Sequence, residues 1–136
     1  MKLKTRRRKY LREATVMLAT ARMAVSWLPA SRVLAWAGRA PRRINRFSQD
    51  EVGWVTWSVE TIGDKQWMKA LCLPRALAAQ AMLRRRGIAS RLCLGVARDG
   101  EALAAHAWLE LGREIVVGGA ETPRFQRLVE FGGKAA

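Results

Sequence analysis

Histidine and cysteine are scarce in this sequence of 136 residues, which has one histidine, His106, and two cysteines, Cys72 and Cys93. Their spacing matches no zinc motif, so we expect no metal site. A disulfide between the two cysteines would need an oxidising compartment, and nothing else in the chain is typical of a secreted protein. We therefore expect both thiols to be free.

Long apolar runs are also missing, and none approaches the length that crosses a bilayer. The basic N-terminus and the apolar stretch at 14–21 have the outline of an export signal, but Arg22 interrupts the stretch. The helical pattern continues past Arg22 to Leu28, so we interpret this segment as part of the folded domain. We predict a cytoplasmic protein without a transmembrane segment.

Acidic residues are few, 11 Asp and Glu against 25 Lys and Arg, which gives a net charge of +14. Residues 1–47 contain 13 of the basic residues and one acid, Glu13, and therefore carry +12 of this charge. A segment this basic attracts polyanions, anionic lipid or an acidic partner, and its charge alone does not select one of them. Its ordinary role is a solvated surface.

Half of the residues are apolar, which is enough for one folded domain with a modest core. Apolar residues at helical spacing over 11–28 predict an amphipathic first helix that Pro29 ends. Ser31 is the predicted N-cap of a short second helix, and a capping box at 48–51 starts a third helix.

Beyond Gly87 the apolar pattern alternates with the period of a strand, which predicts strands over 90–97, 103–111 and 114–117. Short turns join these strands into antiparallel hairpins. Helices followed by antiparallel strands indicate the α+β class.

Cys72 is predicted to open the fourth helix, because Pro74 suits a first helical turn, where the N–H that proline lacks has no intrahelical partner. A helix N-terminus and a neighbouring imidazole both favour the thiolate, which is the nucleophilic form of cysteine. His106 lies on the predicted strand 103–111. Papain-like and transglutaminase-like folds assemble a Cys-His pair from a cysteine at a helix start and a histidine on a later strand.

Each of these residues also has an ordinary structural interpretation. Free cysteine is often a small buried side chain, and Cys93, which lies in an apolar alternation without a base beside it, fits that description. A single histidine is often a hydrogen-bonded core residue. The two sequence contexts taken together favour the catalytic interpretation of Cys72 and His106.

The combined pattern resembles the transglutaminase-like cysteine peptidases of lasso-peptide biosynthesis, which occur as discrete leader peptidases or as the C-terminal half of a fused B protein. The resemblance is dense between residues 70 and 120 and covers the N-terminal helices in general character only. It rests on Cys72-Leu73-Pro74-Arg75-Ala76-Leu77, on 83–92, on Leu94-Gly95-Val96, and on Ala105-His106-Ala107-Trp108-Leu109-Glu110 with the later Gly112-Arg113.

The resemblance implies a hydrolase that removes the leader of a ribosomally made precursor peptide, with Cys72 as the nucleophile and His106 as its base. The product belongs to the ribosomally synthesised and post-translationally modified peptides (RiPPs). The resemblance implies no cofactor. The expected partners are the precursor, a small leader-recognition protein and an ATP-dependent cyclase that forms the macrolactam. The implied architecture is a transglutaminase/papain-like core over 48–136, with the nucleophile helix packed on a small sheet. A basic helical arm and loop over 1–47 precedes this core within one compact domain.

The resemblance also implies a third residue that orients the histidine, and the sequence has no acid where strand pairing predicts one. With a tight turn at Gly112-Arg113, Leu111 faces Glu114 and His106 faces Gly119, with Gly118 beside it. Glu121 reaches back only if these glycines form a bulge, and Glu110 lies about 13 Å along the strand, too far to orient the ring. A backbone carbonyl is the remaining alternative, and the orienting group stays unassigned.

Gln66 lies six residues before Cys72, the offset at which papain-like enzymes carry an oxyanion-hole glutamine, although a surface glutamine in a loop is the ordinary interpretation. The backbone N–H of Cys72 is another natural donor. Core packing is expected for most of the six tryptophans. Trp67 and Trp108 are close enough in sequence to the site to wall a peptide groove.

Two other functions stay open at this stage. An acyltransferase would use the same Cys72 and His106 and pass the acyl group to an amine rather than to water. A binding module would use the basic N-terminal segment for nucleic acid or an anionic membrane, with both residues merely structural. No base-reading motif supports specific nucleic-acid binding.

Overall fold

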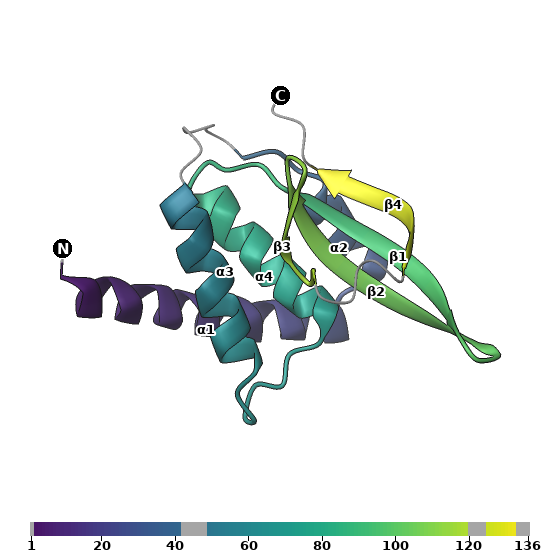
Figure 1. Cartoon of the computed structure of the whole chain (residues 1–136), viewed down its shortest axis with the longest axis horizontal. Coiled ribbons are helices and arrows are strands. Elements are labelled where there is room, and N and C mark those ends of the chain that lie inside the picture. Colours follow the sequence, from purple (N-terminus) through teal and green to yellow (C-terminus); the bar gives the residue numbers. More distant parts are fainter. Residues whose placement is uncertain (1, 42–48, 120–124, 133–136) are drawn as a thin grey trace.

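The computed structural model describes residues 2–41, 49–119 and 125–132, which form four helices and four strands (Figure 1). The helices come first in the chain: α1 (Leu3–Trp27), α2 (Ala30–Ala37), α3 (Gln49–Gly63) and α4 (Cys72–Arg85). The strands follow: β1 (Arg91–Asp99), β2 (Ala102–Leu111), β3 (Glu114–Val117) and β4 (Gln126–Gly132). The predicted α+β class is confirmed. No helix in the described ranges is long and apolar enough to span a membrane.

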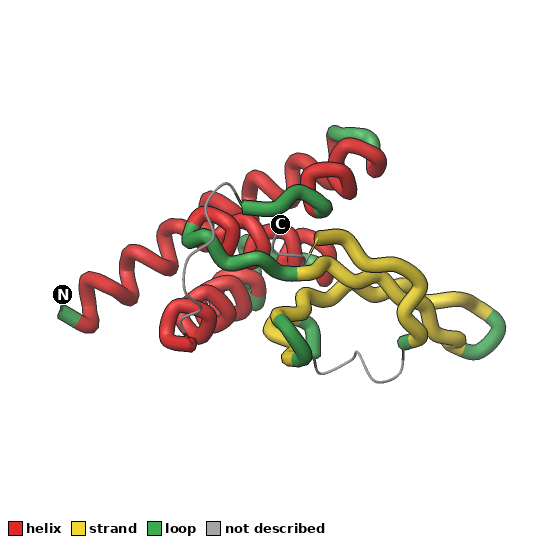
Figure 2. The backbone as a smooth tube through the Cα atoms, turned by 90° about the horizontal axis from the view of Figure 1, so that it is seen from above, coloured by secondary structure: helices red, strands yellow, loops and turns green. Residues whose placement is uncertain are grey.

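The strands form one antiparallel sheet in the order β3-β2-β1-β4, and Figure 2 shows the helices gathered on one side of it. Successive side chains of a strand point to opposite faces. On β2, Ala107 and Leu109 pack into the core with the helices. His106, Trp108 and Glu110 alternate with them and therefore lie on the other face. This alternation separates the core side of β2 from the side that carries its polar groups.

The first helix is confirmed and begins earlier than the apolar stripe, at Leu3. Its buried residues, Tyr10, Ala14, Leu18 and Ala21, recur at helical spacing, and the helix packs against α3 and α4. Burial of this stripe stabilises a helix whose exposed surface contains both basic and apolar residues.

The second helix begins at Ala30, so the prediction that Ser31 caps it is wrong. Pro29 occupies the N-cap position in an extended conformation, and its carbonyl accepts hydrogen bonds from the amides of Arg32 and Val33. The proline ring fixes the backbone there without any side-chain cap. The capping serine predicted for the third helix, Ser48, lies outside the described residues.

The predicted strands are confirmed with small shifts of their ends, and β4 is an addition that the alternation did not predict. β4 pairs with β1 and makes β1 a central strand of the sheet. The β2–β3 hairpin turns at Gly112, which has a positive φ of 60° that glycine adopts without steric cost. Leu111 pairs with Glu114 across this turn, as predicted.

Candidate active site

Cys72 is the first residue of α4, as the position of Pro74 in the first turn predicted. The residue is partly exposed. Leu71 precedes it in an extended conformation without a side-chain cap. The N–H groups of a first helical turn have no intrahelical acceptor. Cys72 therefore occupies the end of α4 at which the helix has unpaired N–H groups.

The sulfur of Cys72 accepts a hydrogen bond from the backbone amide of Ala107, with an N to Sγ distance of 3.4 Å. Ala107 directly follows His106 on β2. A strand's N–H groups point along the sheet rather than out of its faces, so this contact places the sulfur at an edge of β2. The fold thus brings the start of α4 next to the strand position of His106.

The imidazole of His106 is buried and is packed between two aromatic rings. The ring of Trp108 stacks on it with centroids 5.8 Å apart, and the ring of Phe125 lies tilted at 4.8 Å. The Nε2 atom lies 3.0 Å from the carbonyl oxygen of Gly118, just past the end of β3. These three contacts fix the plane of the ring.

The partner of Nε2 determines the tautomer of the His106 ring. A carbonyl oxygen only accepts hydrogen bonds, so Nε2 must carry the hydrogen, and in the neutral ring Nδ1 is then the basic nitrogen. Within the described part of the chain, no hydrogen bond joins either ring nitrogen to the sulfur of Cys72. The structure brings the two residues to neighbouring positions and leaves the sulfur bonded to the amide of Ala107.

The group that orients the ring of His106 is the backbone carbonyl of Gly118. A backbone carbonyl is one of the alternatives that the sequence leaves open. The β2–β3 register shifts between Leu109 and Glu110, so Leu109 pairs with Val117. This shift differs from the regular pairing that set His106 opposite Gly119, and it brings the carbonyl of Gly118 to the ring. Glu121 lies outside the described residues.

Glu110 is buried and is bonded to other groups. Its carboxylate accepts hydrogen bonds from the indole Nε1 of Trp108 at 2.7 Å and from Arg91 at 3.0 Å, and it forms an ion pair with Arg127. Burial opposes ionisation, yet the hydrogen bonds and the charge of Arg127 keep the pKa of Glu110 below its ordinary value of 4.5. Glu110 therefore holds the indole that supports His106 and does not itself orient the imidazole.

The segment that leads into Cys72 is held by Arg75 from the first turns of α4. Its Nε donates to the carbonyl of Ala70 at 2.8 Å, and its guanidinium pairs with Asp64 at 2.7 Å. Lys69 has a positive φ of 40°, an uncommon conformation for a residue with a side chain. The backbone immediately before the candidate nucleophile is therefore clamped to the helix that carries it.

Gln66 is exposed in the turn after α3, and the described residues include no hydrogen bond from it to the site. Its proposed role in an oxyanion hole stays a prediction. Trp67 is 64% exposed, which leaves it available to line a groove, whereas Trp108 is 1% exposed. The prediction that Trp108 walls a peptide groove is wrong, because its indole packs beneath His106 and bonds Glu110.

Cys93 is fully buried on the same face of the sheet as Trp108. Burial, together with the neighbouring Glu110 carboxylate, raises the pKa of its thiol to about 12. Both cysteines are free thiols. The environments of the two sulfurs differ in the way expected of a structural cysteine, Cys93, and an available one, Cys72.

Three contributors to the site had little signal in the sequence. Arg127 lies in β4 and Phe125 directly before it, and this strand was not predicted. The carbonyl of Gly118 is brought to the ring by a register shift that alternation does not reveal. Among the described residues, no three His, Cys, Asp or Glu side chains cluster so that they could hold a metal ion.

A protein-family model described as the transglutaminase-like superfamily matches residues 15–130. The match covers most of the chain and includes Cys72 and His106, and the chain belongs to this superfamily. Its members are often cysteine-dependent enzymes. A search of curated proteins found no significant match, and a search of solved structures found none either.

Proposed function

We propose that the protein is a cysteine peptidase that removes the leader from a ribosomally synthesised lasso-precursor peptide, with Cys72 as the nucleophile and His106 as the base. The contact of the Cys72 sulfur with the amide of Ala107, one residue past His106, is the observation that carries the catalytic pair. The choice of substrate is supported by the resemblance of the segments 72–77 and 105–110 to the leader peptidases.

In this mechanism, Nδ1 of His106 takes the proton of the Cys72 thiol, and the thiolate attacks the carbonyl carbon of the last leader residue. The peptide C–N bond then breaks, and the imidazolium returns the proton to the departing amine of the core peptide. The leader remains as a thioester on Cys72. Water, deprotonated by the same nitrogen, hydrolyses this thioester to a free carboxylic acid and restores the thiol.

Backbone groups stabilise both charges that develop in these steps. The carbonyl of Gly118 accepts the Nε2 hydrogen of His106 and stabilises the imidazolium while it holds the ring in place. The N–H of Cys72, at the start of α4, is the natural donor to the oxyanion of the tetrahedral intermediate. The catalytic pair then needs no third acidic side chain.

Lasso-peptide processing supplies the partners in this proposal. A small leader-recognition protein presents the precursor, the peptidase frees the N-terminal amine of the core, and an ATP-dependent cyclase uses this amine to form the macrolactam. The reaction takes place in the cytoplasm, where the precursor is synthesised.

The test is leader cleavage in a reconstituted mixture of a lasso precursor, a leader-recognition protein and this protein. Wild type and Cys93→Ala should release the leader, whereas Cys72→Ala should retain its fold and release none. Substitution of the nucleophile in such enzymes lowers the rate by several orders of magnitude. Full cleavage by Cys72→Ala would refute the assignment.

An acyltransferase is the second candidate, because the superfamily match is compatible with both activities. The same reaction, run with an added primary amine, separates the two. Hydrolysis gives a leader that ends in a free acid, and transfer gives an amide that differs in mass. An amide as the main product would identify the protein as an acyltransferase rather than a peptidase.

A further inference from the structure

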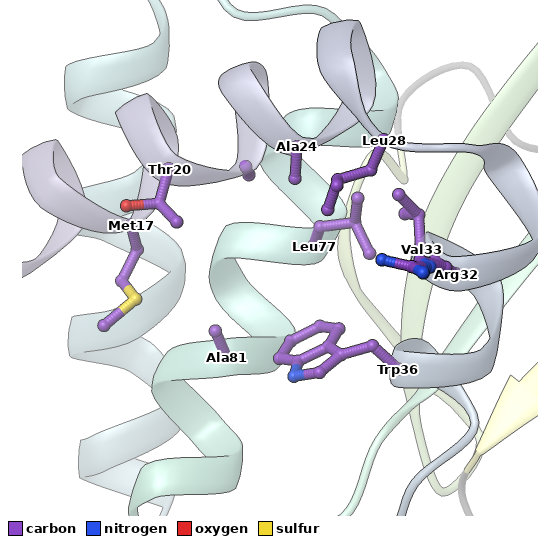
Figure 3. A pocket seen from close by; sticks show the side chains of 10 residues that line it. Met17, Thr20, Ala24, Leu28, Arg32, Val33, Trp36, Leu77 and Ala81 are labelled. Carbon is purple, nitrogen blue, oxygen red and sulfur yellow. The ribbon is translucent and has the colours of Figure 1, made fainter.

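A hollow of about 280 Å³ lies between α1, α2 and α4 (Figure 3). Small side chains make it, because Ala21 and Ala24 of α1 and Ala81 of α4 leave space where the three helices meet. Trp36 and Leu77 form apolar walls. The hollow is large enough to admit a bulky apolar side chain and opens to solvent.

The wall at Trp36 is fixed before any partner binds. The guanidinium of Arg84 lies 4.0 Å from the centroid of the indole and donates a hydrogen bond to the carbonyl of Ala37 at 3.2 Å. A cation over the face of an indole holds the ring in place. The hollow therefore has a preformed shape, as binding pockets for side chains usually do.

An exposed apolar stripe on α1 borders the hollow. Val16, Met23 and Trp27 are 59%, 64% and 83% exposed, and with Thr20 they recur at the spacing of one helix face. Thr20 also lines the hollow. Large apolar side chains that are exposed and aligned on one face of a helix indicate an interaction surface. Exposed apolar residues that are scattered singly over a surface carry no such indication.

The charge of the two helices α1 and α2, which line the hollow, selects the kind of partner. Arg32 is exposed on the hollow's rim, and α1 and α2 together contain eight Lys and Arg against one acid, Glu13. Glu13 is bonded to Arg86 at 2.6 Å. Two copies of a chain with a net charge of +14 would repel one another at this face. An acidic partner is attracted to it instead.

We infer that this face docks an amphipathic helix of an acidic partner protein. A bulky apolar side chain of that helix fills the hollow, further apolar residues cover Val16, Met23 and Trp27, and flanking carboxylates face Arg32. Recognition of this kind, with anchors at helical spacing, is a recurring mode of binding. A preformed hollow fits a protein side chain better than it fits the flat surface of a lipid bilayer.

Neither Cys72 nor His106 lines the hollow. Leu77 and Ala81, the lining residues of α4, lie about 7.5 and 13.5 Å along the helix from Cys72 at the helical rise. The inference does not depend on the proposed function, since it would hold for any activity at Cys72. A substitution in the hollow should therefore change binding and leave the intrinsic reactivity of Cys72 unchanged.

The test uses a synthetic, fluorescently labelled helix of about five turns with Leu and Trp on one face and Glu on the other. Wild type and the control Ala35→Phe, an exposed position of α2 outside the hollow, should bind it with similar affinity. Ala81→Phe fills the hollow and should weaken binding about tenfold or more. Trp27→Ala, which alters no packed residue, should weaken binding in the same direction.

Two further probes separate docking of a helix in the hollow from attraction by charge alone and from binding to lipid. A helix with Ala in place of Leu and Trp should bind much more weakly, and phosphatidylserine vesicles should not distinguish Ala81→Phe from wild type. Equal binding of the Ala helix, or equal affinity of wild type and a folded Ala81→Phe, would show attraction by charge alone and overturn the inference. Tight binding to vesicles without binding to the Leu-Trp-Glu helix would identify a lipid surface and overturn it as well.

Discussion

The backbone amide of Ala107 donates its hydrogen to the sulfur of Cys72, although the two residues are 35 positions apart in the sequence. The contact joins the first residue of α4 to the edge of β2. It gives one of the two thiols a partly open position next to a backbone donor. The other thiol, at Cys93, is fully buried on the face of the sheet that carries Trp108.

Alkylation should therefore discriminate between the two cysteines. Iodoacetamide at mildly alkaline pH should modify Cys72 in the folded protein and spare Cys93, whose pKa is raised to about 12 by burial and by the neighbouring Glu110. Mass spectrometry of proteolytic peptides gives the extent of reaction at each site. Denaturant should make both sites react, and comparable rates in the folded protein would contradict the described environments.

Gly95 should not tolerate a side chain. A Cβ there would lie 2.7 Å from the carbonyl oxygen of Gln126 and 2.8 Å from the indole of Trp108, so β4 or the indole would have to move. We expect Gly95→Ala to lower the free energy of unfolding by about 1–3 kcal/mol, as overpacking usually does.

Gly53→Ala is the matched control for this substitution. Gly53 lies within α3, and a Cβ added there would have no atom of another element within 4 Å, so the methyl group meets open space. Alanine in a helix interior should raise the free energy of unfolding by about 0.5–1 kcal/mol. Urea unfolding of both variants gives the sign of each change in the free energy of unfolding. A stabilised Gly95→Ala would show that β1 and β4 pack differently.

A comparison of two glycines tests whether the carbonyl of Gly118 orients His106. Gly118 and Gly112 have φ values of 83° and 60°, so alanine is strained at both. Only at Gly118 does the new Cβ approach the ring, at 3.3 Å from Nε2 of His106. At Gly112 it meets nothing within 4 Å.

Gly118→Ala should therefore lose activity beyond its loss of stability. Both variants should be destabilised by about 1–2 kcal/mol from backbone strain. The kcat of leader cleavage should fall by about tenfold or more for Gly118→Ala and change little for Gly112→Ala, at a temperature where both are folded. An equal effect of the two substitutions on kcat would assign the loss to strain and remove the orienting role of Gly118.

Local sequence rules predicted the elements that carry the candidate pair. Pro74 placed Cys72 at a helix start, and the tight turn at Gly112 set Leu111 opposite Glu114, both of which the structure bears out. These features depend on neighbouring residues alone. Periodicity over a few turns or a single hairpin is enough to reveal them.

The parts of the site that escaped prediction depend on long-range packing. β4 pairs with β1 more than 30 residues earlier in the chain, and only this pairing brings Arg127 to Glu110. The register shift at Leu109 places the carbonyl of Gly118 at the ring, and a bulge has no fixed signature in alternation. The prediction of a groove wall at Trp108 fails because the indole is buried by its contacts with His106 and Glu110, and sequence proximity does not reveal burial.

The buried carboxylate of Glu110 should stabilise the fold in a pH-dependent way. Its pKa is below the ordinary value of 4.5, because the hydrogen bonds from Trp108 and Arg91 and the charge of Arg127 outweigh the opposing effect of burial. The ionised form therefore stabilises the folded state at pH above 4.5. This contribution is lost as the pH falls below 4.5 and through the lower pKa of the folded state.

Glu110→Gln removes the charge with almost no change of shape and leaves Glu130 as the acidic partner of Arg91 and Arg127. At pH 7 we expect the free energy of unfolding to fall by about 1–3 kcal/mol, because hydrogen bonds to a charged carboxylate become weaker bonds to a neutral amide. The difference from wild type should shrink steadily between pH 4.5 and pH 3, because protonation brings the wild-type side chain to the same neutral state. Urea unfolding across this pH range measures it, with Glu101→Gln at the exposed β1–β2 turn as the control. A difference that stays constant down to pH 3, or one as small as that of the control, would mean that ionised Glu110 does not hold Trp108 and β4 together.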